Sequence, residues 1–313
     1  MLDSNFMERL NERIMTFHNP SLLGLDPQLA YLPEYLLRPL EGQSGEGLSQ
    51  AIAAALTAYN RELLEACADI IPAVKFQMAY YEQYGLGGLQ ALQASLDIAR
   101  QMGYLIIVDA KRNDIGATAG AYAQAFITLA ETPYGQKVPA FQGDALTVNF
   151  YLGSDGVQPF AKSLRETGKG IFLLLRTSNP SGQEIQDLIL ADGRKLYESL
   201  AERAVAWAEE YRQEGESYSP IGLVVGATYP KEAEKLRRHC PHLFFLVPGY
   251  GAQGAGASDV AAAFSKQGGG AIVNSSRGLM NAYKDRKMPH ESFAIACREA
   301  ALEMRADLSA FVQ

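Results

Sequence analysis

The segment YLIIVDAKRNDIGAT, residues 104–118, joins an unbroken apolar run to four ionisable residues that lie within six positions. An apolar run without polar alternation is typical of a strand that is buried on both faces, as in a parallel sheet. Asp109, Lys111, Arg112 and Asp114 follow at its carboxyl end. The segment therefore indicates a buried strand that ends where ionisable groups are used.

Seven further apolar runs have the same character, and each leads through polar or glycine-rich residues into a helical pattern. The eight predicted strands lie at 21–26, 71–77, 104–111, 145–150, 170–178, 221–228, 243–250 and 270–278. Eight strands that alternate with helices predict a parallel α/β fold, the closed (β/α)8 TIM barrel. An open doubly wound sheet is the alternative, but the first strand leads into GLDPQLAYLPEY, which lacks the glycine pattern of a dinucleotide site.

The rest of the chain fits one barrel domain that spans residues 1–313. Apolar residues recur at helical spacing within residues 1–20, which predicts an amphipathic N-terminal helix. A helical insertion is predicted at 181–220, between the fifth and sixth strands. We expect neither segment to form a separate domain.

Composition and charge limit the possible functions. The 313 residues are 48% hydrophobic and carry a net charge of −7, so a broad nucleic-acid-binding surface is not expected. The three cysteines and four histidines show no metal-ligand spacing, and scattered cysteines suit a reducing compartment. We find no signal-peptide core and no run long enough to cross a bilayer. We therefore expect a cytoplasmic protein without nucleic-acid or membrane partners.

Charged residues gather at the predicted carboxyl ends of the strands, where barrel enzymes hold their active sites. Side chains alternate along a strand, so Asp109 and Lys111 point the same way, and Lys75 on the neighbouring strand can face the same space. Together with Asp114 they predict a row of alternating charges, which lowers the penalty of burial. A salt-bridge network that only caps the barrel mouth is the structural alternative.

Two glycine-rich or polar loops follow the last two strands, VPGYGAQGAGAS at 247–258 and VNSSRG at 273–278. Glycines let backbone N–H groups approach an anion, and such loops build a phosphate site in many barrels. Arg277 can donate two hydrogen bonds to phosphate oxygens, and Gln253 can donate from the first loop. A glycine-rich loop alone also fits an ordinary turn, but its combination with Arg277 favours a site for a phosphorylated small molecule.

With these motifs the chain resembles the orotidine 5′-phosphate decarboxylase family, in its longer bacterial subfamily. The matching stretches are LDP at 25–27, VKF at 74–76, DAKRNDIGAT at 109–118, TSNP at 177–180, VPGYGAQG at 247–254 and SSRG at 275–278. Ser276 departs from the pattern, because the family often has glycine there, yet its backbone N–H remains for phosphate. The charge motif alone is shared with sugar-phosphate decarboxylases and synthases, so the glycine loop is the more specific match.

The resemblance implies removal of the C6 carboxylate of orotidine 5′-phosphate, without a metal or organic cofactor, by a homodimer with shared active sites. It implies that Lys111 is a buried ammonium that stabilises the C6 carbanion and protonates it, and that Asp109 lies near the departing carboxylate. The other implied site residues are Asp26 and Lys75 at the ribose, Ser178 at the pyrimidine, Gln253, Ser276 and Arg277 at the phosphate, and Asp114 and Thr118 in the partner's site.

Three other functions stay open. One is a sugar-phosphate decarboxylase or synthase of the same barrel superfamily, which usually needs magnesium. A second is a Schiff-base aldolase that uses Lys111 or Lys75, although flanking carboxylates oppose the neutral amine that this reaction needs. The third is a non-catalytic phosphate-binding barrel, against which the intact Asp109, Lys111 and Asp114 argue.

Overall fold

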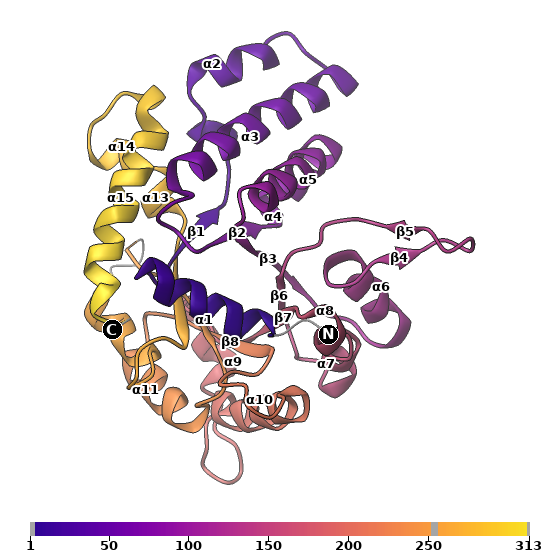
Figure 1. Ribbon diagram of the computed structural model, residues 1–313, viewed down its shortest axis with the longest axis vertical. Helices are drawn as coiled ribbons and strands as arrows, with labels where there is room; N and C mark the ends of the chain where they lie inside the picture. Colours follow the sequence, from indigo (N-terminus) through magenta and orange to yellow (C-terminus); the bar gives the residue numbers. More distant parts are fainter. Residues whose placement is uncertain (1–3, 252–255, 312–313) are drawn as a thin grey trace.

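A closed barrel of parallel strands forms the centre of the protein, as seen in a computed structural model that describes residues 4–251 and 256–311 (Figure 1). Within those ranges the barrel strands are β1 (Ser21–Leu25), β2 (Ala73–Gln77), β3 (Leu105–Arg112), β6 (Ala145–Val148), β7 (Gly170–Arg176), β8 (Ile221–Val225), β9 (Phe245–Pro248) and β10 (Ala271–Ser275). They follow one another in chain order, and β10 pairs with β1 to close the ring. The predicted TIM barrel is confirmed.

Helices cover the outside of the barrel and fill the connections between its strands (Figure 1). Their bounds are α1 (Phe6–Phe17), α2 (Glu34–Leu37), α3 (Gly45–Cys67), α4 (Ala79–Glu82), α5 (Gly85–Gln101), α6 (Gly116–Phe126), α7 (Ser154–Ala161), α8 (Leu164–Thr167), α9 (Gln183–Gln186), α10 (Leu196–Tyr211), α11 (Pro230–His239), α12 (Ala257–Val260), α13 (Arg277–Met280), α14 (Ala282–Asp285) and α15 (Phe293–Leu308). Among these described helices, none combines the length and the apolar character that a membrane span requires.

Side chains along each strand alternate between the barrel interior and the outer core beneath the helices. In β3, Ile107 packs inside the barrel with Phe172. Val108 and Ala110 instead join the core between strands and helices. Because this alternation has a period of two, Asp109 falls on the inner side with Ile107.

Helix α1 closes the end of the barrel at which the strands begin. Phe6, Leu10 and Ile14 are fully buried and belong to the apolar cluster inside the barrel. The same cluster contains Ala73 and Ala145, which are the first residues of β2 and β6. The predicted amphipathic helix therefore forms the floor of the barrel, opposite the carboxyl ends of the strands.

Asn5 determines where α1 begins. Its Oδ1 accepts hydrogen bonds from the N–H groups of Met7 and Glu8, at 2.8 and 3.3 Å, which satisfies two donors that lack partners within the helix. Its Nδ2 donates to the Tyr218 carbonyl at 2.8 Å. One side chain therefore both caps the helix and attaches it to the segment before β8.

The predicted insertion at 181–220 contains the regular helix of its barrel unit. Helix α10 packs against β7 and β8, which is the place of the crossover helix between two parallel strands. The additional length therefore lies mostly before α10, in residues 179–195. This segment holds the short helix α9.

A short antiparallel hairpin, β4 (Ala130–Glu131) with β5 (Lys137–Val138), extends from the barrel after α6 (Figure 1). Tyr134 at its tip is 88% exposed. This hairpin was not predicted from the sequence.

Replacement of Leu10 by alanine should lower the free energy of unfolding by about 2–5 kcal/mol, because it opens a cavity in a fully buried contact between α1 and the barrel interior. Urea titration followed by circular dichroism measures the loss. Thr16→Ala on the exposed face of the same helix is the matched control and should change stability by less than about 0.5 kcal/mol. Equal effects of the two substitutions would mean that α1 does not support the barrel.

Candidate active site

Five of the residues predicted from the sequence line one cavity of about 530 Å³ at the carboxyl ends of the strands. They are Asp26, Lys75, Asp109, Lys111 and Ser178. Strand register explains the meeting of three of them, because Lys75 pairs with Gly24 of β1 and Asp109 pairs with Gln77 of β2. The closed barrel thus brings the ends of β1, β2 and β3 to a single space.

The Asp109 carboxylate is the centre of the site. Its Oδ1 lies 2.7 Å from Lys111 Nζ and accepts a hydrogen bond of 2.8 Å from Thr147 Oγ1. Its Oδ2 lies 3.1 Å from Lys75 Nζ and accepts a hydrogen bond of 2.8 Å from Gln77 Nε2. Both oxygens of this buried carboxylate are therefore fixed from two sides.

The two lysines keep Asp109 ionised. Burial alone would raise the pKa of its carboxyl group, but the charges of Lys75 and Lys111 outweigh burial and hold that pKa well below its usual range. Burial would likewise lower the pKa of Lys75, but Asp26 and Asp109 raise it above its ordinary value. Both buried groups are therefore charged at neutral pH.

Lys111 stands at the mouth of the cavity. Its side chain is 47% exposed, whereas that of Lys75 is 5% exposed, so the expectation of a buried ammonium is wrong for Lys111. The backbone gives the reason, because Lys111 has φ +48°, in the left-handed region that residues other than glycine rarely adopt. Its N–H donates to Thr147 Oγ1 at 2.9 Å. Strand β3 is therefore irregular at Lys111 before Arg112 pairs with Val148 of β6, and the Lys111 ammonium faces the cavity opening.

After this irregularity the chain leads away from the cavity, so Asp114 does not join the predicted row of charges within its own chain. Asp114 Oδ1 accepts the N–H of Ile115 at 2.8 Å, and among the described residues Asp114 forms no ion pair. Asp26 takes the second acidic place instead, with its Oδ1 at 3.6 Å from Lys75 Nζ. Thr118 lies on the exposed side of α6. Neither Asp114 nor Thr118 is among the residues that line the cavity of their own chain.

The predicted phosphate residues lie at the adjacent strand end. Ser276 follows β10, and Arg277 begins α13. A Cβ atom at position 24 would lie 2.0 Å from Ser276 Oγ, so Gly24 of β1 leaves the space that the serine uses. Gln253 lies outside the described residues.

Five further polar residues line the cavity and were not among the predicted site residues: Gln77, Thr147, Thr177, Asn179 and Asn274. Gln77 lies two positions after Lys75, and Thr147 is the polar residue within an apolar strand. The period-two rule applied to every strand would have found both. Asn274 is 8% exposed, and its Nδ2 donates to Ser276 Oγ at 3.3 Å.

The arrangement combines two carboxylates and two ammonium groups, of which only Lys111 is substantially open to the cavity mouth. Such a group can stabilise negative charge that develops on a bound molecule and can then donate a proton to it. Within 4–251 and 256–311, no cluster of three or more His, Cys, Asp or Glu side chains is placed to hold a metal ion.

Comparison with known proteins places this site in a family. The sequence model of the orotidine 5′-phosphate decarboxylase / HUMPS family matches residues 50–289. This chain belongs to that family. The family's decarboxylase from Rhodopirellula baltica is 42% identical over 298 residues, which cover 94% of this chain and 93% of the relative. That of Caldicellulosiruptor saccharolyticus is 37% identical over 282 residues, with coverage of 90% and 91%.

Solved structures of the decarboxylase family share the whole fold. The OMP decarboxylase structure from Leishmania donovani matches this chain with a TM-score of 0.69 at 30% identity, and the match covers 96% of this chain and 99% of the other. The family resemblance drawn from the motifs is confirmed.

Replacement of Thr147 by valine should lower the free energy of unfolding by about 1.5–3 kcal/mol, because a charged acceptor loses its hydrogen bond at constant side-chain volume. Because the pKa of Asp109 is lower in the folded state, its ionised carboxylate stabilises the fold fully at pH values above its unfolded-state pKa of about 3.9. This stabilisation is lost as the pH falls through the folded-state pKa. The Thr147→Val loss should therefore stay constant between pH 7 and about pH 4.

Denaturant titrations of the wild type and of Thr147→Val between pH 7 and about pH 4 measure the difference in their free energies of unfolding. Thr147→Ser keeps the hydroxyl and should retain most of the hydrogen-bond contribution. A loss that fades between the two pH values would show that Asp109 titrates in this window and that its pKa is not depressed.

Proposed function

We propose that this protein decarboxylates orotidine 5′-phosphate to uridine 5′-phosphate and carbon dioxide, the final step of UMP synthesis. The observation that carries the proposal is the Asp109 carboxylate held between Lys75 and Lys111 in a cavity at the carboxyl ends of the strands. Membership of the family supports the same reaction.

The chemistry follows from the charges around Asp109. The bond between C6 and the carboxylate breaks, its electron pair stays on C6, and carbon dioxide leaves. The Lys111 ammonium stabilises this carbanion and then transfers a proton from Nζ to C6. Asp109 stays ionised beside the departing carboxylate, so the repulsion between the two anions is relieved when carbon dioxide leaves. Stabilisation of the carbanion is the larger contribution, because prearranged charge is usually the strongest catalytic effect.

The remaining residues of the site hold parts of the substrate that do not react. In this proposal Asp26 and Lys75 bind ribose hydroxyls, and Ser178 binds the pyrimidine amide. Gln253, Arg277 and the backbone N–H of Ser276 bind phosphate. Binding energy from the phosphate can then be used to orient the pyrimidine and to exclude water.

The active enzyme is proposed to be a homodimer in which Asp114 and Thr118 complete the partner's site. In its own chain Asp114 does not contact the lysines of the cavity, and the adjacent Ile115 is 53% exposed. Helix α7 lies beside this segment, since a Cβ atom at Gly156 would lie 3.5 Å from the Asp114 carbonyl oxygen, and the loop before α7 exposes Tyr151 at 82%. An exposed apolar surface next to a carboxylate that forms no ion pair among the described residues suits contact with a second copy.

Two broader proposals concern the whole chain. We propose that residues 1–313 form one domain, in which segment 1–20 closes the barrel floor and segment 181–220 packs on its side. We also propose a cytoplasmic location, because three cysteines scattered along the chain suit a reducing compartment.

Lys111→Ala should lower the turnover of orotidine 5′-phosphate by at least about 10⁴-fold, because the substitution removes both the stabilising charge and the proton donor. The absorbance change of the pyrimidine on decarboxylation measures turnover, and a thermal melt confirms the fold. Lys231→Ala on the exposed face of α11 is the matched control and should leave turnover unchanged. Activity of the Lys111 variant within about tenfold of wild type would exclude this lysine as the acid.

Mixing the two inactive variants Lys111→Ala and Asp114→Asn should restore about a quarter of wild-type activity, if subunits exchange at random across a two-fold interface. Half of the dimers are then mixed, and each mixed dimer has one site with both groups intact and one site with neither. The absorbance assay measures the recovery. No recovery, with exchange verified by mass spectrometry of labelled subunits, would place Asp114 in its own chain's site.

A further inference from the structure

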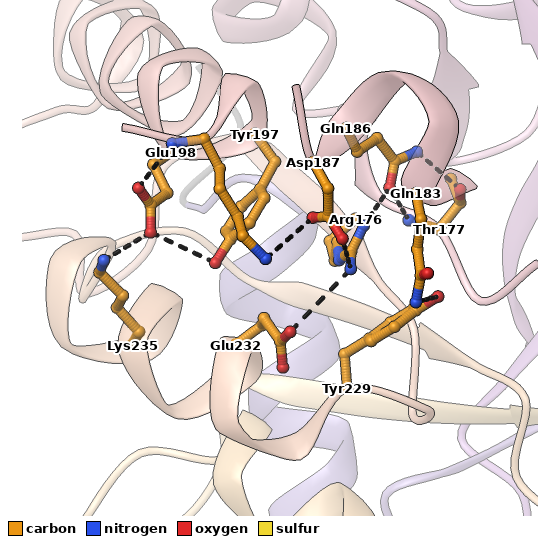
Figure 2. Close-up of polar contacts among 11 residues, drawn as sticks. Arg176, Thr177, Gln183, Gln186, Asp187, Tyr197, Glu198, Tyr229, Glu232 and Lys235 are labelled. Atoms are coloured by element: carbon orange, nitrogen blue, oxygen red, sulfur yellow. Dashed lines mark hydrogen bonds and ion pairs between the residues drawn. The ribbon is translucent and has the colours of Figure 1, made fainter. Parts of the chain in front are cut away.

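Arg176 at the carboxyl end of β7 is a fully buried cation outside the Asp109 site. Its Nη2 lies 3.2 Å from Asp187 Oδ2 and 4.0 Å from Glu232 Oε1. Its guanidinium carbon lies 3.9 Å from the centre of the Tyr229 ring, within cation–π range. Figure 2 shows these groups converging on Arg176 from two segments of the chain, the end of α9 and the start of α11. Two acids and an aromatic face thus replace the water that a buried arginine loses.

Gln186 at the end of α9 connects this cluster to the strand end. Its Oε1 accepts hydrogen bonds from Arg176 Nη1 at 3.3 Å and from the Thr177 backbone N–H at 3.1 Å. Its Nε2 donates to Thr177 Oγ1 at 2.7 Å (Figure 2). One amide therefore holds both the backbone and the side chain of Thr177, and Arg176 orients that amide.

The residues directly after Arg176 form one wall of the catalytic cavity. Thr177, Ser178 and Asn179 all line it, whereas Gln186 does not. The pairing of β7 with β8 shifts register between Leu174 and Arg176, so regular strand pairing ends before this wall begins. The positions of Thr177, Ser178 and Asn179 therefore depend on side-chain contacts, because backbone hydrogen bonds between strands no longer hold them.

We propose that Gln186, oriented by Arg176, is a positioning residue that sets the place of Ser178 against the pyrimidine. This inference rests on the proposed function, since it takes Ser178 to be the pyrimidine contact. Gly226 indicates how narrow the tolerance is, because a Cβ atom there would lie 2.8 Å from the Ser178 backbone. A shift of Thr177 would move Ser178 without disturbing Asp109, Lys75 or Lys111. The segment before α10 thereby serves recognition of the base.

The test compares a ligand that carries the pyrimidine with one that lacks it. Gln186→Leu removes all three hydrogen bonds at similar volume, and inhibition constants are measured for uridine 5′-phosphate and for ribose 5-phosphate. We expect binding of uridine 5′-phosphate to weaken by about tenfold, the equivalent of one hydrogen bond. Binding of ribose 5-phosphate should stay within about twofold, since its contacts lie elsewhere.

Two variants of the same helix serve as controls. Gln183 is exposed, and its amide nitrogen lies 3.4 Å from the Tyr229 hydroxyl and forms no hydrogen bond with Thr177. Gln183→Leu should therefore change neither inhibition constant. Gln186→Glu keeps acceptors for Arg176 and for the Thr177 N–H and lets the Thr177 hydroxyl donate, so it should recover most of the affinity for uridine 5′-phosphate. Thermal melts establish that each variant is folded.

A double-mutant cycle keeps the test decisive if Gln186→Leu is unstable. Thr177→Val removes the hydroxyl that accepts a hydrogen bond from Gln186 and should weaken uridine 5′-phosphate binding. The double variant with Gln186→Ala should lose less affinity than the sum of the two single losses. The positioning role is overturned if both ligands lose affinity equally, if the affinity losses in the cycle are additive, or if no affinity is lost. None of these results bears on the proposed function, as long as the wild-type protein turns over orotidine 5′-phosphate. A wild-type protein that neither turns over this substrate nor binds uridine 5′-phosphate overturns the proposed function and this inference together.

Discussion

A buried carboxylate that must stay ionised determines how this site is built. Asp109 receives two contacts on each oxygen, and its partners come from its own strand and from both neighbouring strands. Without β2, Asp109 would lose Lys75 and Gln77, and without β6 it would lose Thr147. The order of β2, β3 and β6 in the barrel therefore also neutralises Asp109, and α1 closes the opposite end of the same barrel.

The sequence predicted the part of the site that strand alternation controls. Lys75 and Asp109 lie on regular strands, so a period of two places them on the inner side, and eight apolar runs predict the ring that brings them together. Within its own chain Asp114 does not join the row of charges, although the predicted row continued past Lys111. Lys111 has a left-handed backbone conformation that redirects the chain there. Residue spacing does not predict such a conformation in a residue other than glycine.

Other features depend on contacts between distant segments, which a single sequence does not reveal. The position of Gln186 follows from the packing of α9 against the end of β7, and Gln186 has no periodic pattern that marks it. The hairpin of β4 and β5 has two-residue strands, too short for any alternation to be read. Thr147 differs from these, since it lies on a regular strand and was missed only because a hydroxyl was not counted among the candidate charged groups.

The backbone and the side chain of Lys111 act on stability in opposite directions. A left-handed conformation in a residue with a Cβ atom is unfavourable by about 1–2 kcal/mol, and glycine or asparagine would relieve much of that strain. The ion pair with Asp109 offsets that strain, because loss of the Lys111 ammonium would leave a buried carboxylate with one cation fewer. A thermostability screen should therefore gain little from glycine or asparagine at this position, and lysine can be retained without a large stability reserve elsewhere.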